Sequence, residues 1–173
     1  VSPESVAAAI KDNTCLVAIM YASNEVGTIE PIADIVKAVK SIRNIPFLTD
    51  AVQAVGNIPV NVKELGVDML SFSGHKIHAP KGIGGLYIKK GVRLKNFIEG
   101  GGQEKGKRSG TEGLANIIAM AKAMEISRDR MPERASLEKK RDKLIAGITS
   151  IPDTYLTGHP TKRLPGNASF VFK

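Results

Sequence analysis

Apolar residues along this chain follow two spacings, and each spacing predicts a type of element. Short uninterrupted apolar runs predict strands at residues 15–21, 47–49, 67–72 and 85–88. Apolar residues that recur every three or four positions predict a helix from Pro31 to about Ile42 with one buried face. Further helices are expected at residues 3–10, 113–129 and 132–149, and a short helix or turn at residues 61–65.

Strands that alternate with helices predict an α/β fold with a mainly parallel sheet. The early strands lack clean polar–apolar alternation, so we expect helices on both faces of the sheet. Residues 1–130 are expected to form part of a large domain, and residues 131–173 a connecting helix and the beginning of a smaller domain. Strand-like pieces near 154–157 and 167–172 would belong to that smaller domain.

Predicted strands in the first half of the chain end in polar residues with usable chemistry. These ends read Asn24-Glu25, Asp50-Ala51-Val52-Gln53 and Ser73-Gly74-His75-Lys76. Ligands of open α/β sheets bind at the carboxyl ends of the strands, so we expect these side chains to lie close together. A lysine facing a carboxylate suits pyridoxal phosphate (PLP), because lysine forms a Schiff base and the carboxylate keeps the ring nitrogen protonated.

Each of these residues also has an ordinary structural explanation. A single aspartate such as Asp50 more often caps a helix, and Asn24 could simply shape a turn before Pro31. A lysine after a strand is usually a solvated surface residue. The occurrence of all of them in one order favours the PLP site. His75 and His78 have no evident third partner, so we predict no metal.

Composition narrows the classes of partner. The net charge of +8 comes from scattered lysines and arginines, and the chain has no Trp, so we expect no nucleic-acid stacking surface. No apolar run approaches the ~20 residues of a membrane span, and we expect no membrane partner. The single Cys15 excludes an internal disulfide, which fits a reducing, cytoplasmic location. Because Cys15 lies in an apolar run, we expect a buried, inert thiol.

A set of motifs in a fixed order resembles a known family. Beside the strand ends already named, these are Ser23-Asn24-Glu25-Val26-Gly27, Pro80-Lys81-Gly82-Ile83-Gly84-Gly85-Leu86, Gly100-Gly101-Gly102-Gln103-Glu104 and Arg108-Ser109-Gly110-Thr111. Together they resemble the NifS/IscS-type cysteine desulfurases of the class V aminotransferase group of PLP enzymes. The resemblance implies part of the large domain of the PLP-dependent transferase fold, which is aspartate aminotransferase-like.

The resemblance also implies a role for each site residue. Lys76 would hold PLP and shuttle a proton, and His75 beside it would belong to the catalytic pair. Asp50 would pair with the ring nitrogen, Asn24 and Gln53 would face the phenolic oxygen, and Ser73 and His75 would bind the phosphate. Thr111 would reach across a homodimer interface to the partner's phosphate.

The activity implied is the conversion of L-cysteine to L-alanine, with sulfur passed as a persulfide to an acceptor protein for iron–sulfur cluster or thio-cofactor biosynthesis. The family's threonine phosphate loop and ring-stacking histidine would precede Val1, and its persulfide cysteine and substrate-binding arginine would follow Lys173. We therefore expect a fragment that is inactive alone. The alternatives are a selenocysteine lyase or other class V enzyme, and a non-catalytic dimerising remnant.

Overall fold

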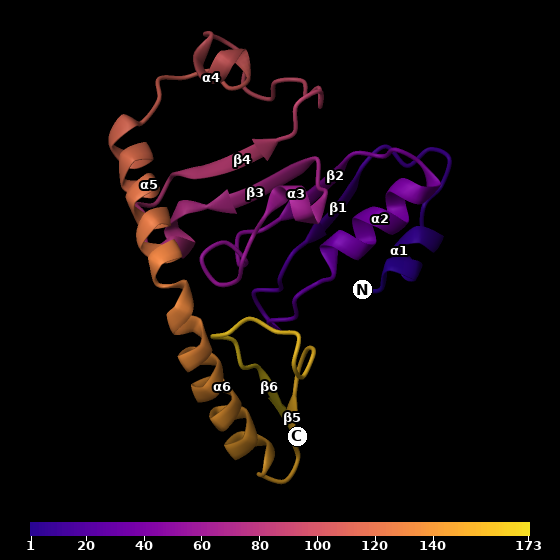
Figure 1. Cartoon of the computed structure of the whole chain (residues 1–173), viewed down its shortest axis with the longest axis vertical. Coiled ribbons are helices and arrows are strands. Elements are labelled where there is room, and N and C mark those ends of the chain that lie inside the picture. The colour runs from indigo at the N-terminus through magenta and orange to yellow at the C-terminus, as the bar shows by residue number, and fades with distance from the viewer.

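The computed structural model describes residues 1–173 and contains two separate sheets joined by a long helical rod (Figure 1). The strands are β1 (Val17–Met20), β2 (Phe47–Asp50), β3 (Met69–Ser73), β4 (Gly84–Ile88), β5 (Thr154–Leu156) and β6 (Phe170–Phe172). The helices are α1 (Pro3–Ala8), α2 (Ile32–Ile42), α3 (Val62–Leu65), α4 (Gln103–Gly106), α5 (Leu114–Asp129) and α6 (Arg134–Thr149). Two 3₁₀ turns are η1 (Gly74–Ile77) and η2 (Met131–Glu133).

The larger sheet has the order β1-β2-β3-β4 and is mainly parallel. β1 pairs with β2 and β2 with β3 in parallel, whereas β4 returns antiparallel to β3 after a short connection. The predicted α/β fold with a mainly parallel sheet is therefore confirmed. The parallel strands β1 to β3 give the sheet an amino edge, where they begin, and a carboxyl edge, where they end.

One face of this sheet forms the hydrophobic core. Val17, Phe47 and Leu70 point from β1, β2 and β3 toward α2, whose Ile35 and Val39 are fully buried. On the opposite face Met69 is buried, but Met20 and Leu86 are 43% and 50% exposed. Within this chain α2 covers the core face, and the exposed part of the opposite face lies around Met20 and Leu86.

A buried carboxylate ties the amino edge of the sheet together. Asp68, only 6% exposed, precedes β3 and accepts a hydrogen bond from the backbone N–H of Phe47 at the start of β2 (2.9 Å). Its Oδ2 also lies 2.6 Å from Nζ of Lys40 on α2, and Lys89 after β4 lies 3.8 Å from Oδ1. This cluster joins the starts of two strands to the core helix.

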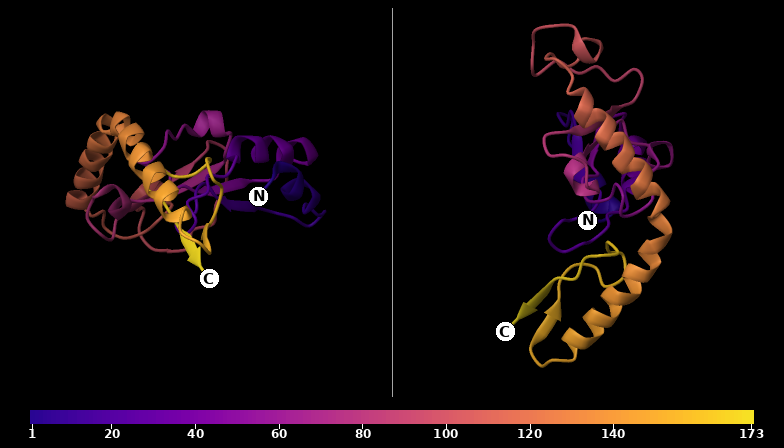
Figure 2. Two further views of the ribbon diagram at one scale, coloured as in Figure 1. Left: turned by 90° about the horizontal axis from the view of Figure 1, so that it is seen from below. Right: turned by 90° about the vertical axis from the view of Figure 1, so that its left-hand side faces the viewer.

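The rod formed by α5, η2 and α6 runs the length of the molecule and leads to the antiparallel pair β5–β6 (Figure 2). The expected helices and closing strands are present, while the division between residues 130 and 131 stays a prediction. The Gly-rich motif that begins at Gly100 leads into the short α4, in which Glu104 and Lys105 have positive φ. None of the helices combines the length and apolar composition that a membrane span requires.

The prediction of a buried Cys15 is wrong. The thiol is exposed, because β1 begins only at Val17 and Cys15 belongs to the connection from α1. That connection enters the sheet at its amino edge.

Candidate active site

Asp50, Ser71 and Ser73 share the open face of the sheet at its carboxyl edge. Asp50 is the last residue of β2 and is in register with Ser71 on β3. Ser73 lies two positions further along β3, so its side chain projects on the same face. The strand periodicity thus brings a carboxylate and two hydroxyl groups together where no helix covers them.

The turn after β3 presents Lys76 and His75 to solvent. Gly74 begins η1 and is buried, and a Cβ there would lie 2.9 Å from Ile83 Cγ2 and 3.0 Å from the Ile83 carbonyl oxygen. Only glycine leaves room for the chain that returns into β4. His75 Nδ1 lies 2.7 Å from the Ser73 hydroxyl, so these two predicted phosphate-binding groups already form a pair.

The turn after β2 holds Asp50 and Gln53. Asp50 Oδ1 accepts a hydrogen bond from the Val52 N–H (2.9 Å), so the capping role considered for this aspartate is present. Its other carboxylate oxygen has no partner within the chain. Ala51 and Ala54 are fully buried and anchor the turn, while Gln53 is half-buried.

Asn24 lies on the loop that follows β1. Here Ser23, not Asn24, shapes the turn, because the Ser23 hydroxyl accepts hydrogen bonds from the N–H groups of Glu25 and Val26 (both 3.2 Å). The Asn24 carboxamide makes no hydrogen bond within the chain and is exposed. The turn-forming explanation for Asn24 therefore does not apply to its side chain.

The carboxyl edge thus collects polar groups that the fold itself does not use. Lys76 Nζ, the Asn24 and Gln53 carboxamides and one Asp50 oxygen have no partner within the chain. An amine, a carboxylate, amides and a hydroxyl–imidazole pair match in kind the aldehyde, ring nitrogen, phenolic oxygen and phosphate of PLP. The residues present therefore fit that cofactor.

Thr111 is the one predicted site residue that stands apart. It is exposed on the segment between α4 and the start of α5, and no hydrogen bond joins it to the other predicted residues. In Figure 1 this segment lies at the far end of the molecule from β5–β6. Within one chain, Thr111 makes no hydrogen bond to the group around Lys76.

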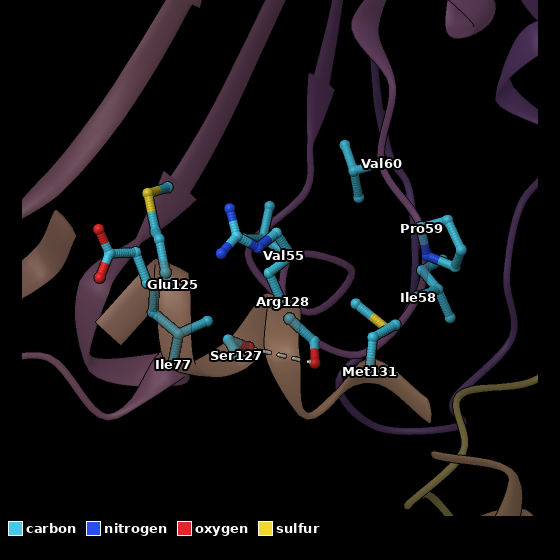
Figure 3. Close-up of a pocket in the computed structure, with 11 residues that line it drawn as sticks. Val55, Ile58, Pro59, Val60, Ile77, Glu125, Ser127, Arg128 and Met131 are labelled. Atoms are coloured by element: carbon cyan, nitrogen blue, oxygen red, sulfur yellow. Dashed lines mark hydrogen bonds between the residues drawn. The ribbon is translucent and has the colours of Figure 1, made fainter. Parts of the chain in front are cut away.

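A hollow of about 560 Å³ lies elsewhere, between residues 55–60 and α5 (Figure 3). Ile58, Pro59 and Val60 line one side, and Ile77 and Met131 complete an apolar floor. None of the predicted site residues lines it. A cofactor site normally combines concavity with convergent polar groups, and here the polar groups lie instead on the open sheet face.

Tyr21, directly after β1, is the titratable group near this edge with a shifted pKa. Burial of the phenol raises its pKa above the usual 10.0, and the negative charge of Glu64 adds to the shift. Its backbone N–H donates to the Asp50 carbonyl (2.8 Å), which continues the β1–β2 ladder to the edge of the sheet. Tyr21 is therefore a neutral neighbour of the polar cluster over the whole physiological pH range.

Sequence reasoning missed the residues behind the Asn24 loop. Arg163, 1% exposed, and Asn167 bind the backbone of this loop from the segment that precedes β6. Neither residue follows a strand or belongs to a spacing that signals a site, and the contact joins positions more than a hundred residues apart. Only the folded chain reveals it.

Comparison with known proteins agrees with this geometry. The profile of the family described as Aminotransferase class-V matches residues 1–173. The chain belongs to the class-V aminotransferases. It is 47% identical over 174 residues to the "Cysteine desulfurase IscS" of Methanosarcina thermophila, covering 100% of this chain and 43% of that protein.

Solved structures of NifS-like proteins share the fold. A NifS-like protein superposes with a TM-score of 0.92 at 42% identity, over 99% of this chain and 47% of that one. The NifS-like protein from Rickettsia africae gives a TM-score of 0.87 at 33% identity, over 95% and 47%. Class-V aminotransferases are PLP-dependent enzymes, and the family resemblance of the motifs is confirmed. The chain spans less than half the length of the curated relatives it matches.

Proposed function

We propose that this chain carries the PLP-binding part of a cysteine desulfurase, which converts L-cysteine to L-alanine and passes the sulfur on as a persulfide. The observation that carries the proposal is the uncommitted Lys76 amine on the turn after β3, at the same carboxyl edge where the adjacent strand β2 ends in Asp50. The identity to proteins named cysteine desulfurase supports the substrate. In the cytoplasm, such an enzyme would act as a homodimer and serve iron–sulfur cluster or thio-cofactor biosynthesis through an acceptor protein.

When bound, PLP supplies an electron sink for bonds at the substrate α-carbon. In the proposal Lys76 binds the cofactor covalently and then moves a proton at that carbon, with His75 beside it. Asp50 keeps the ring nitrogen protonated through its free oxygen, while Val52 N–H orients the carboxylate through the other. Asn24 and Gln53 hold the phenolic oxygen.

In this proposal Ser73 and His75 bind the phosphate group of PLP. Their 2.7 Å contact leaves Nε2 of the imidazole ring without a partner inside the chain. We assign Thr111 to the partner's phosphate in the homodimer, since no hydrogen bond joins it to the group around Lys76 within the chain.

Sulfur transfer needs a thiol at the site, and Cys15 does not meet that need. Cys15 enters β1 at the amino edge of the sheet, whereas Lys76 follows β3 at the carboxyl edge. The proposal therefore requires a persulfide-forming cysteine other than Cys15. Replacement of Cys15 by serine is expected to leave desulfuration unchanged.

The test is the visible absorption of the protein mixed with PLP. We expect a yellow band that borohydride removes, and we expect Lys76→Ala to remain colourless. Lys90→Ala, on an exposed lysine beyond β4 at the amino edge, is the matched control and should keep the band. Alanine release from L-cysteine by the PLP-loaded complete protein then tests the reaction. A colourless unaltered protein would contradict the proposal.

A further inference from the structure

The loop that carries Asn24 is bound along its backbone by a distant segment, residues 157–167. The Ile29 N–H donates to the Lys162 carbonyl (2.9 Å), and the Leu164 N–H donates to the Gly27 carbonyl (2.8 Å). The His159 N–H donates to the Thr28 hydroxyl (2.9 Å). These contacts dock the two segments in an antiparallel arrangement, which an isolated bridge between Thr28 and Arg163 marks.

Two side chains from the distant segment hold the tip of this loop. Arg163 Nη2 donates to the Val26 carbonyl (2.9 Å) and to the Thr157 carbonyl (3.2 Å), while its Nε donates to the Asn167 carbonyl (3.1 Å). Asn167 Nδ2 donates to the carbonyls of Asn24 (3.4 Å) and Glu25 (3.3 Å). The two side chains also contact each other, Arg163 Nη2 to Asn167 Oδ1 at 3.3 Å.

The fit between the segments leaves no room for larger residues. A Cβ on Gly27 would lie 2.4 Å from Asn167 Oδ1, and a Cβ on Gly158 would lie 2.4 Å from the Val26 carbonyl oxygen. Both glycines also have positive φ, at 73° and 75°. Backbone approach this close at both sides marks a built contact rather than two loops that touch in passing.

Burial of the charged Arg163 side chain at this contact is energetically unfavourable. Its guanidinium is 1% exposed, has no carboxylate partner, and leaves Nη1 without any hydrogen bond. Burial and the nearby positive charge of Arg141 lower the pKa of Arg163. Carbonyl dipoles and the nearby negative charge of Asp142 offset the buried charge, and one of these carbonyls, that of Val26, comes from the Asn24 loop.

Asn24 therefore has a fixed backbone and a free side chain. Its carbonyl is bound from behind by Asn167, while its carboxamide makes no contact within the chain and is exposed. The hydrogen bonds inside the loop come from Ser23 and do not reach the Asn24 carbonyl. A binding side chain held through its backbone in this way is preorganised for a ligand.

We propose that Arg163, together with Asn167, is a positioning residue that sets the place of the Asn24 carboxamide against the cofactor. The inference rests on the proposed function, because it takes the Asn24 amide as the donor to the phenolic oxygen of PLP. In addition, residues 157–167, which lie outside the larger sheet, adjust the position of the Asn24 amide relative to the phenolic oxygen. A shift of this segment changes the electronic state of the cofactor through Asn24.

The test measures the pH at which bound PLP loses its visible band. An amide donor on the phenolic oxygen withdraws charge that would otherwise hold a proton on the lysine nitrogen, so its loss raises this pH midpoint. Asn24→Ala is expected to raise the midpoint by about one pH unit, the size of one hydrogen bond to a charged group. Arg163→Met is expected to raise it in the same direction by a smaller amount.

The double variant separates positioning from a general loss of stability. If Arg163 acts through Asn24, Arg163→Met causes no further shift in the Asn24→Ala background. Arg43→Met is the matched control, since Arg43 also donates to backbone carbonyls, those of Lys11, Asp12 and Thr14, on the connection from α1 to β1. It should leave the midpoint unchanged. Asn167→Ala repeats the test if Arg163→Met does not fold.

A second readout needs no cofactor. In Arg163→Met without PLP, the amides of residues 23–29 should exchange with deuterium at least about tenfold faster, while those of β2 and β3 stay protected. A shift for Asn24→Ala with none for Arg163→Met and Asn167→Ala would overturn the inference and leave the proposed function intact. Failure of the unaltered protein to bind PLP would overturn both, and unchanged exchange would by itself refute the contact that carries the inference.

Discussion

The two edges of the larger sheet use their aspartates in opposite ways. At the amino edge, Asp68 is buried and binds the Phe47 N–H, Lys40 and Lys89. At the carboxyl edge, Asp50 is exposed and uses one oxygen for a single local hydrogen bond. Asp68 precedes β3 and Asp50 ends β2, and one carboxylate is fully occupied by the fold while the other is left available.

The difference separates structural from functional polar groups. A buried charge must be paired, so the cluster around Asp68 is explained by stability alone. The groups around Asp50 and Lys76 have no such explanation, because the fold would form without their free atoms. Unoccupied polar atoms gathered at one edge are what a ligand site requires before its ligand arrives.

The largest effect is expected at the amino edge. Asp68→Asn removes the charge that pairs with Lys40 and should lower the free energy of unfolding by about 2 kcal/mol, because Asp68 is buried while the Lys40 side chain stays 25% exposed and keeps the Ile45 carbonyl as an acceptor. Asp50→Asn, the matched change at the other edge, should lower it by less than about 1 kcal/mol, because an asparagine Oδ1 still accepts from Val52. Urea unfolding compares the two variants, and equal losses would break the distinction between the edges.

The second effect concerns PLP affinity, for which Asp50→Asn should be the more harmful of the two variants. Asp50→Asn should weaken PLP binding about tenfold or more, since it removes a charge-assisted hydrogen bond to the ring nitrogen. Asp68→Asn should leave the affinity of the folded protein for PLP unchanged. Titration with PLP, followed by absorbance, measures both, and an unchanged affinity in Asp50→Asn would remove Asp50 from the site.

The turn that presents Lys76 should be sensitive to a single methyl group. Gly74→Ala is expected to cost about 1–3 kcal/mol of stability, because the new Cβ meets the Ile83 backbone and overpacks the turn. Gly102→Ala, where a Cβ meets nothing within 4 Å, is the control and should change little. Thermal unfolding of both variants would show whether Gly74 is required by this close approach.

The smallest effect concerns Tyr21 at the carboxyl end of β1. Its raised pKa means that the unfolded chain loses the phenol proton first, so stability should fall as the pH rises above about 10. Tyr21→Phe should remove this part of the alkaline loss. Titration of the phenolate absorbance measures the shift directly, and a midpoint for Tyr21 at its ordinary value in the folded chain would contradict the burial of its hydroxyl.

Much of the fold and of the site could be predicted from local patterns. The apolar runs located β1 to β4, and the polar ends of those runs placed Asp50, Ser73 and Lys76 at the carboxyl edge, where ligands of parallel sheets bind; their roles in a site stay predictions. Local patterns carry no information on partners far along the chain. The exposure of Cys15, the open face around Met20 and the contact of Arg163 with Val26 depend on such partners, and for that reason the sequence reasoning did not find them.

The most direct test of the account identifies which lysine binds PLP. The protein is mixed with PLP, reduced with borohydride and digested, and the pyridoxyl-modified peptide is located by mass spectrometry. The account predicts modification at Lys76, with exposed lysines such as Lys81 and Lys90 unmodified at equimolar PLP. Modification spread over these lysines, or none at Lys76, would contradict the claim that the free groups at the carboxyl edge form a cofactor site.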